Sequence, residues 1–489
     1  MNQNFKRSAP FLALLGLVLG GCQPDLSNDP KSSAGQADFS RYIAVGNSLT
    51  AGFSDNGLYR EGQLNSYPSI LAQQFSRVGG GTFVQPLFTE AQASGSGYVR
   101  LAGFTTPTAN SNSSPITAPV AGSAGRNTPT SAPYTKFTEP VNNLGIPGIR
   151  MSDINTAGYG STQGNPYFER ITPDAMALQT YLQRVQATVG SIKPTFFTSW
   201  LGNNDVLGYA TAGAAANAIT PLATFTTNNN QMLDALISGG AKGVVATIPD
   251  VTGIPFFTTA GPSFRATLAL PANNVPSAAP FVYTTGTLAP GQPNTRVNTT
   301  LASIRDASGA GNLLLTLTAS PYLGLYGRPS GKYWRDFYQQ ARPSLPPTIP
   351  NLSTFLLVMG VDTTRAFGQT TQNPFPSTLV LDDVEQTAVV NATNDFNRAL
   401  ISAANARNLA IFDANTFFRG VAANGIMNNT IMNSAAFISG NLFSLDGVHP
   451  TPRGYAFIAN EMIKAINAKY DASIPTVDAT KYRGVQFPR

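Results

Sequence analysis

Three side chains in this sequence have the types needed for nucleophilic catalysis: Ser48, Asp446 and His449. Ser48 follows the apolar run 42–46, which is typical of a buried strand, and precedes an expected helix. Its hydroxyl would therefore lie at the carboxyl end of a strand, the edge where open α/β sheets bind ligands. A serine hydroxyl is a poor nucleophile near neutral pH. It needs a base beside it, most often an imidazole that a carboxylate holds in one tautomer.

His449 is the one histidine among 489 residues, so no other imidazole could activate Ser48. Asp446 precedes it by three residues in a loop-like stretch, and both side chains could face the sheet edge together. Each residue also has a simpler explanation. A serine after a strand often only caps a helix, and a lone histidine is often a satisfied structural group. The catalytic interpretation therefore requires two segments far apart in the sequence to meet.

Two further stretches would bring hydrogen-bond donors toward the same edge. Residues 200–205 follow an apolar run and carry a side-chain amide at a strand end. Residues 143–148 contain glycines, whose backbone N–H can approach a ligand closely because there is no Cβ.

Taken in order, these four stretches resemble the blocks of the GDSL or SGNH hydrolase family, named after serine, glycine, asparagine and histidine. Gly46–Leu49 is similar to the first block, with Asn47 in place of the usual aspartate. Asparagine keeps an acceptor at the same reach, so it can still order the turn. The glycine of the second block falls on Gly148. The third block falls on Gly202–Asp205 and the fifth on Asp446–His449.

The resemblance implies a serine esterase or lipase that cleaves carboxylic esters through an acyl-enzyme. Ser48 would be the nucleophile, His449 the general base and Asp446 its orienting acid. The backbone N–H groups of Ser48 and Gly148, with the amide of Asn204, would form the oxyanion hole. No metal or organic cofactor is required. A multi-histidine metal site is impossible with one histidine, whereas an all-oxygen calcium site stays open.

Strands that alternate with helical stretches predict a parallel sheet covered on both faces. The resemblance implies a specific α/β fold: a three-layer α/β/α sandwich with a mainly parallel five-stranded sheet. This is the flavodoxin-like SGNH hydrolase fold, here over residues 41–469. The expected strands are 42–46, 82–84, 195–200, 243–248 and 409–413.

Helix signals are clearest in the last third of the chain. Asp382 and Asp383 open a helix whose apolar positions fall on one stripe, and Thr451 and Pro452 are good starting residues for another helix. The expected stripe of the first helix comprises Val384, Ala388, Ala392, Phe396, Leu400 and Ala403.

The N-terminus has the features of an exported lipoprotein. Residues 1–21 combine two basic residues with an apolar run too short to span a membrane, as in a signal peptide. The run ends in Leu-Gly-Gly-Cys, which resembles a bacterial lipobox with Cys22 as the lipidated residue. An ordinary signal peptide is the alternative. Residues 22–40 would form a flexible tether, so we expect an exported protein held on a bacterial membrane, at its periplasmic or cell-surface side, by the lipid on Cys22.

Composition narrows the remaining classes. Cys22 is the only cysteine, so the mature domain has no internal disulfide. The net charge is +6, or +4 without the signal peptide, and no basic run exists, which argues against nucleic-acid binding. Hydrophobic residues, at 42%, can fill a sizeable core. We expect a monomer that acts on a small-molecule, glycan or lipid ester.

Two loop-rich insertions, at about 85–140 and 251–379, interrupt the expected core, and 470–489 would be a surface tail. The second insertion carries an aromatic cluster that either shapes a substrate cleft or packs the insertion on the core. A catalytically silent, lipid-anchored glycan-binding or structural protein on the same fold is the alternative to an esterase. The sequence does not choose among lipid esters, thioesters and acetylated sugars.

Overall fold

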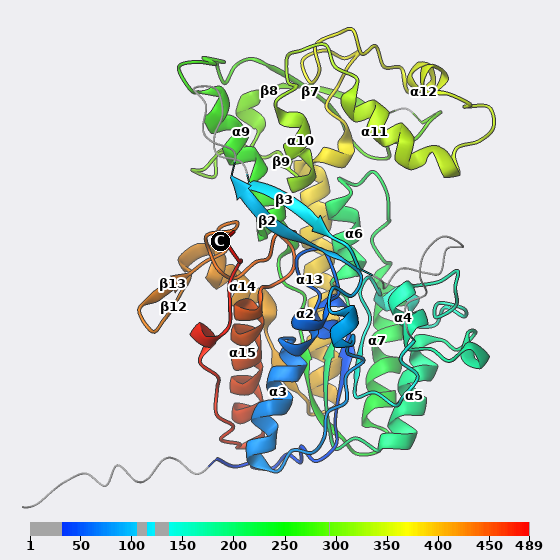
Figure 1. Ribbon diagram of the computed structural model, residues 1–489, viewed down its shortest axis with the longest axis vertical. Coiled ribbons are helices and arrows are strands. Elements are labelled where there is room, and N and C mark those ends of the chain that lie inside the picture. Colours follow the sequence, from blue (N-terminus) through cyan, green and yellow to red (C-terminus); the bar gives the residue numbers. More distant parts are fainter. Residues whose placement is uncertain (1–31, 105–114, 123–135, 293, 489) are drawn as a thin grey trace, which may run out of the picture.

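The computed structural model describes residues 32–104, 115–122, 136–292 and 294–488 (Figure 1). The expected signal peptide and Cys22 lie outside the described residues. Within the described ranges, no helix is both long enough and apolar enough to cross a membrane.

The chain is a mixed α/β protein built on a central, all-parallel sheet. Within the described residues the sheet has five strands in the order β4-β1-β5-β6-β11. Strands β1 and β5 are buried along their whole length, as expected for a parallel sheet covered by helices. The expected parallel α/β sheet is therefore confirmed. The strands are β1 (Tyr42–Gly46), β4 (Asn143–Gly145), β5 (Phe196–Trp200), β6 (Lys242–Ala246) and β11 (Ala410–Phe412).

The strand expected at 82–84 is wrong, and β4 takes that place at the sheet edge. Val84 accepts a hydrogen bond from the N–H of Asn142 at 2.8 Å, but its own N–H goes to the Asn142 side chain at 2.9 Å. Because the side chain replaces the backbone carbonyl, no ladder forms there. The short β4 has the sequence Asn-Leu-Gly, which carries no strand pattern of its own.

Helices cover both faces of the sheet (Figure 1). Helix α3 packs against α15 on one side, and α7 packs against both α5 and α13 on the other. Thr451 caps α15 and Pro452 is its first residue, as predicted. The bounds are α3 (Tyr67–Phe75), α5 (Tyr181–Ile192), α7 (Leu222–Ile237), α13 (Asp383–Ala406) and α15 (Pro452–Tyr470).

The predicted apolar stripe of α13 holds only in its second half. Phe396 and Leu400 are buried, but Val384 is 73% exposed. Glu385 is buried in its place, because Asp382 and Glu385 form a capping box in which each side chain accepts the other's backbone N–H. The geometry of the helix start therefore outweighs the hydrophobicity of Val384.

The first insertion contains an antiparallel hairpin, β2 (Tyr98–Phe104) with β3 (Pro115–Val120), which the sequence did not predict. The remaining short elements of the sheet-bearing part are α1 (Ser48–Ala51), α2 (Arg60–Leu64), α4 (Pro166–Arg170), α6 (Asn204–Thr211), α14 (Ala414–Asn424), β12 (Ile426–Asn428) and β13 (Ile431–Asn433).

Residues 259–380 of the second insertion form a cap at one end of the molecule, the top of Figure 1. The cap has its own hydrophobic core, which includes Tyr333, Trp334 and Tyr338. These aromatic side chains therefore pack the insertion internally. The elements of this insertion are α8 (Pro255–Thr258), α9 (Ala260–Leu268), β7 (Pro280–Thr284), β8 (Arg296–Thr300), β9 (Leu314–Leu315), α10 (Ser320–Leu323), α11 (Lys332–Ala341), α12 (Leu352–Met359) and β10 (Val380–Leu381).

Both ends of the described chain differ from the expected tether and tail. Near the start, Phe39 is 1% exposed and its ring stacks on Phe75 with centroids 4.1 Å apart. After α15, Ile474, Ala479 and Val485 are buried. The C-terminal segment therefore packs against the body of the protein.

Candidate active site

The fold brings Ser48 and His449 together although they are 401 positions apart. Ser48 is the first residue of α1, directly beyond the end of β1. His449 lies in the turn before α15. Its Nε2 is 2.9 Å from Ser48 Oγ, and its Nδ1 is 2.8 Å from Asp446 Oδ2. The three predicted residues thus form one hydrogen-bonded chain from hydroxyl through imidazole to carboxylate.

The three residues lie at the surface of the core, with limited access to solvent. Ser48 is 7% exposed, and the side chains of His449 and Asp446 are 14% and 10% exposed. The ring of Phe53 lies beside the imidazole, with centroids 4.7 Å apart. An enclosed pair of this kind is shielded from bulk water, which strengthens the attraction between an imidazolium and its carboxylate.

Asp446 is the most strongly hydrogen-bonded group of the site. Its Oδ1 accepts the backbone N–H groups of Val448 and His449, each at 2.8 Å, and the Ser444 hydroxyl at 3.1 Å. Its Oδ2 accepts the N–H of Asn56 at 2.9 Å in addition to the imidazole. Burial alone would raise the pKa of Asp446, but the charge and hydrogen bonds of His449 outweigh it and lower the pKa to about 2. The carboxylate is therefore ionised at neutral pH and favours the His449 tautomer with the proton on Nδ1.

Asn47, the residue before Ser48, orders the turn before α1. Its Oδ1 accepts the Leu49 N–H at 3.0 Å, and its Nδ2 donates to Asn203 Oδ1 at 3.0 Å. The side chain is fully buried. The second bond uses an amide donor, which an aspartate at this position would lack, and it links the Ser48 turn to the turn after β5.

A hydrogen bond joins Asn204 to Ile149, the residue that follows Gly148. Gly148 has a φ of +83°, a left-handed conformation that favours glycine. The Asn204 side chain donates to the carbonyl of Ile149 at 2.9 Å. This bond uses one of the two amide hydrogens of Asn204 and leaves the other for a ligand.

Asp205 organises this region, although its position at the end of the third block gave no hint of the role. It is 1% exposed and accepts the backbone N–H groups of Met151 and Ser152 at 2.7 and 3.3 Å, and the Thr220 hydroxyl at 2.6 Å. Burial raises the pKa of Asp205 to about 6. The carboxylate thus ties the loop after Gly148 to the start of α6.

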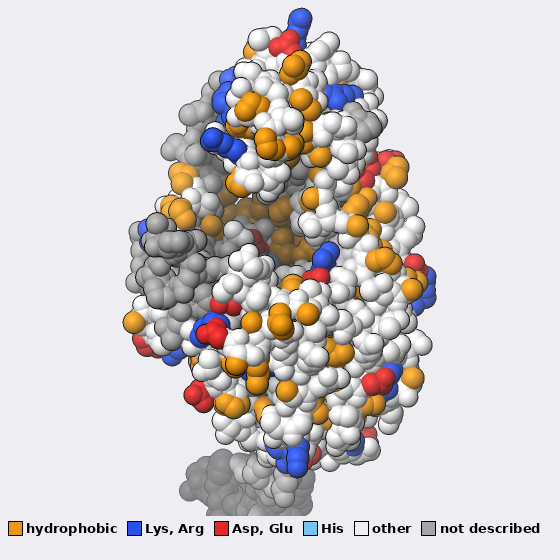
Figure 2. Space-filling view, turned by 90° about the vertical axis from the view of Figure 1, so that its right-hand side faces the viewer, with side chains coloured by type: hydrophobic (Ala, Val, Ile, Leu, Met, Phe, Trp, Pro, Cys, Tyr) orange, Lys and Arg blue, Asp and Glu red, His pale blue; other side chains and the backbone are white. Residues whose placement is uncertain are grey.

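The second insertion contacts the loop that carries His449. The N–H of Phe256, in α8, donates to the carbonyl of Gly447 at 2.9 Å. Gly447 has a φ of +69°, and a Cβ there would lie 3.0 Å from the Phe256 nitrogen and 3.1 Å from a methyl carbon of Leu317. Figure 2 shows a hollow between the cap and the sheet-bearing part, lined with hydrophobic side chains.

Within the described residues, no group of three or more His, Cys, Asp and Glu side chains could hold a metal ion. Comparisons of the chain with protein-family models, with curated proteins and with solved structures give no significant match.

Proposed function

We propose that this protein is a serine esterase or lipase of the GDSL/SGNH type, with the three-layer, flavodoxin-like fold of that family. The observation that carries the proposal is the hydrogen-bonded chain from Ser48 through His449 to Asp446. The strand order, with the second core strand at one edge, also agrees with a flavodoxin-like sheet.

In the proposed reaction, His449 Nε2 takes the proton of Ser48 as the hydroxyl attacks an ester carbonyl. Asp446 stabilises the resulting imidazolium, which then returns the proton to the leaving alkoxide. Water repeats the sequence on the acyl-enzyme and releases the carboxylic acid. The N–H groups of Ser48 and Gly148 and the free amide hydrogen of Asn204 would hold the negative charge on the carbonyl oxygen.

The apolar lining of the hollow in Figure 2 favours an ester with a hydrophobic acyl or alkyl part. We further propose that a lipid on Cys22 holds the enzyme at a bacterial membrane after export. An enzyme tethered there would meet lipid esters at high local concentration.

Hydrolysis of p-nitrophenyl esters from acetyl to palmitoyl, together with acetylated sugars, tests this function. We expect the purified wild type to hydrolyse the longer acyl esters and to be labelled by a serine-reactive phosphonate. Ser48→Ala should lose both activities, and Ser191→Ala, which removes a hydroxyl bonded only within α5, should keep them. A wild type that neither turns over nor labels would instead identify a silent binding or structural protein.

A further inference from the structure

We propose that Asp55 and Arg483 are positioning residues that hold the Asp446–His449 pair in its catalytic geometry. Neither residue touches Ser48 or the imidazole. They act through the turn 54–57 and the backbone next to Asp446. The inference rests on the proposed function, and it gives the C-terminal segment a part in catalysis.

The turn 54–57 contacts the Asp446 loop at several points. The N–H of Asn56 donates directly to Asp446 Oδ2 at 2.9 Å. The N–H of Asp55 donates to Ser444 Oγ at 2.9 Å, and the Ser444 hydroxyl donates to Asp446 Oδ1 at 3.1 Å. In the opposite direction, the N–H of Leu445 donates to Asp55 Oδ1 at 3.1 Å. Two of the five hydrogen bonds to the Asp446 carboxylate therefore depend on where this turn lies.

The turn adopts a backbone conformation that needs support. Asp55 and Asn56 have φ values of +52° and +61°, and Ser54 and Gly57 close the turn with two backbone hydrogen bonds of 2.9 Å. Two successive left-handed residues other than glycine are costly, and such conformations persist only where the surroundings hold them. Two side chains of the turn bond to the rest of the protein: the Ser54 hydroxyl donates to the carbonyl of Pro450 at 2.9 Å, and the Asp55 carboxylate accepts from Leu445 and Tyr59.

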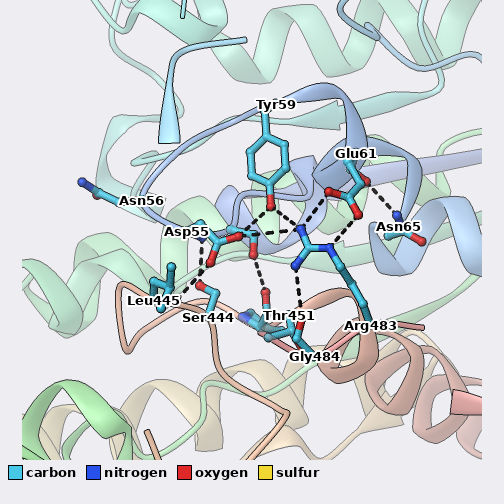
Figure 3. Close-up of polar contacts among 12 residues, drawn as sticks. Asp55, Asn56, Tyr59, Glu61, Asn65, Ser444, Leu445, Thr451, Arg483 and Gly484 are labelled. Carbon is cyan, nitrogen blue, oxygen red and sulfur yellow. Dashed lines mark hydrogen bonds and ion pairs between the residues drawn. The ribbon is translucent and has the colours of Figure 1, made fainter. Parts of the chain in front are cut away.

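Arg483 holds the Asp55 carboxylate from the far end of the chain (Figure 3). Its guanidinium binds both oxygens of Glu61 at 2.6 and 2.8 Å and donates to the Tyr59 hydroxyl at 3.0 Å. The Tyr59 hydroxyl in turn donates to Asp55 Oδ2 at 2.7 Å, and the guanidinium lies 3.8 Å from the same oxygen. Because the planar guanidinium binds Glu61 through two parallel hydrogen bonds, its orientation is fixed as well as its position.

The charge of Arg483 matters because Asp55 is only 5% exposed. Burial raises the pKa of Asp55, and the hydrogen bonds from Leu445 and Tyr59 and the charge of Arg483 oppose that rise. Without Arg483 the carboxylate would be buried with less compensation, and protonation or movement of the side chain would become easier.

Arg483 is itself fixed to the start of α15. The backbone N–H of Arg453 donates to the carbonyl of Arg483 at 2.9 Å. The guanidinium of Arg453 donates to the carbonyl of Tyr482 at 3.0 Å. The start of α15 therefore holds the C-terminal segment, this segment holds the turn 54–57 through Arg483, and the turn contacts the Asp446 loop.

The test uses full-length Asp55→Asn, Arg483→Gln and Arg483→Lys. Asparagine tolerates the left-handed backbone of position 55, so Asp55→Asn removes the charge without added strain. Arg407→Gln is the matched control, because Arg407 is a partly buried arginine paired with Asp234 on α7. We measure kcat and KM with a p-nitrophenyl ester, the thermal midpoint, and the low-field proton resonance of His449 Nδ1–H. The chain has one histidine, so that resonance needs no assignment.

We expect Asp55→Asn and Arg483→Gln to lower kcat about tenfold to a hundredfold, since a small misplacement of catalytic groups has effects of that size. KM should change less than threefold, and the His449 resonance should shift or broaden. Arg483→Lys keeps the positive charge but loses the bidentate hydrogen bonds to Glu61, so it should retain part of the activity. Arg407→Gln should match the wild type in kcat and in the resonance.

The proposal is overturned if the Asp55 and Arg483 variants unfold at lower temperature yet keep wild-type kcat and an unchanged His449 resonance when folded. Should Asp55→Asn fail to fold, the kcat and the His449 resonance of the two Arg483 variants test the proposal by the same criteria. If the wild type hydrolyses no ester, the proposed function fails, but the resonance still reports whether Asp55 and Arg483 position the Asp446–His449 pair.

Discussion

Replacing Asp446 by asparagine tests the site most directly, because the change replaces one carboxylate oxygen by an NH₂ group and leaves the shape of the side chain intact. Asp446 Oδ1 accepts three hydrogen bonds, two of them from backbone N–H groups that cannot turn away. The single oxygen of an asparagine should take that place, so its NH₂ group would replace Oδ2 and face both His449 Nδ1 and the N–H of Asn56, which would lose its acceptor. His449 would then accept at Nδ1 and carry its proton on Nε2, toward Ser48, where it could no longer act as a base.

Two magnitudes follow from this geometry. A tautomer change of this kind lowers kcat by about 10⁴-fold in a serine protease with the same three groups. For stability, the fall of the Asp446 pKa from 3.8 to about 2 corresponds to about 2 kcal/mol. Since the folded-state pKa is the lower one, this stabilisation is present above about pH 4 and is lost as the pH falls toward 2.

The assay compares wild type and Asp446→Asn in ester hydrolysis at pH 7, in urea unfolding at pH 7 and pH 3, and in the ¹⁵N spectrum of the single histidine. We expect the loss in kcat, a ¹⁵N pattern typical of the Nε2–H tautomer, and a stability difference that narrows at the lower pH. Asp234→Asn, at an exposed carboxylate on α7, is the control. Activity within tenfold of wild type, or an unchanged tautomer, would refute the reasoning.

Three further substitutions probe the surroundings of the site. Asn204→Ala should lower kcat about a hundred- to a thousandfold with a near-normal thermal midpoint, since it removes one oxyanion donor; a variant that turns over normally would exclude that role. Gly447→Ala should lower both the thermal midpoint and kcat, because the left-handed φ of +69° strains any other residue and a Cβ would lie only 3.0 Å from the Phe256 nitrogen, so that the loop or α8 must shift; wild-type stability would contradict this account. Asp205→Ala should cost roughly 1 to 3 kcal/mol in urea unfolding, because the buried donors of Met151 and Thr220 and the half-buried N–H of Ser152 lose their acceptor; a change below about 0.5 kcal/mol, the usual effect of a surface substitution, would count against it.

Local sequence patterns predicted the secondary structure correctly wherever a segment's own residues determine it. The runs before Ser48 and before Gly202 became buried strands, because a strand covered by helices on both faces favours mainly apolar residues. Thr451 and Pro452 marked the start of α15, since capping depends on residues within one turn. These signals place Ser48 and His449 at the ends of elements, but they contain no information about the distance between the two.

Tertiary structure decided everything that depends on a partner far along the chain. Strand β4 forms because β1 offers a free edge, and its sequence has no strand pattern of its own. Tyr333 and Trp334 are buried in the cap, which their aromatic character alone could not distinguish from a substrate wall. Arg483 reads as part of a polar tail, yet it pairs with Glu61 and Asp55, more than 400 positions earlier. Burial and ion pairing act through space, so only the folded chain reveals which charges must meet.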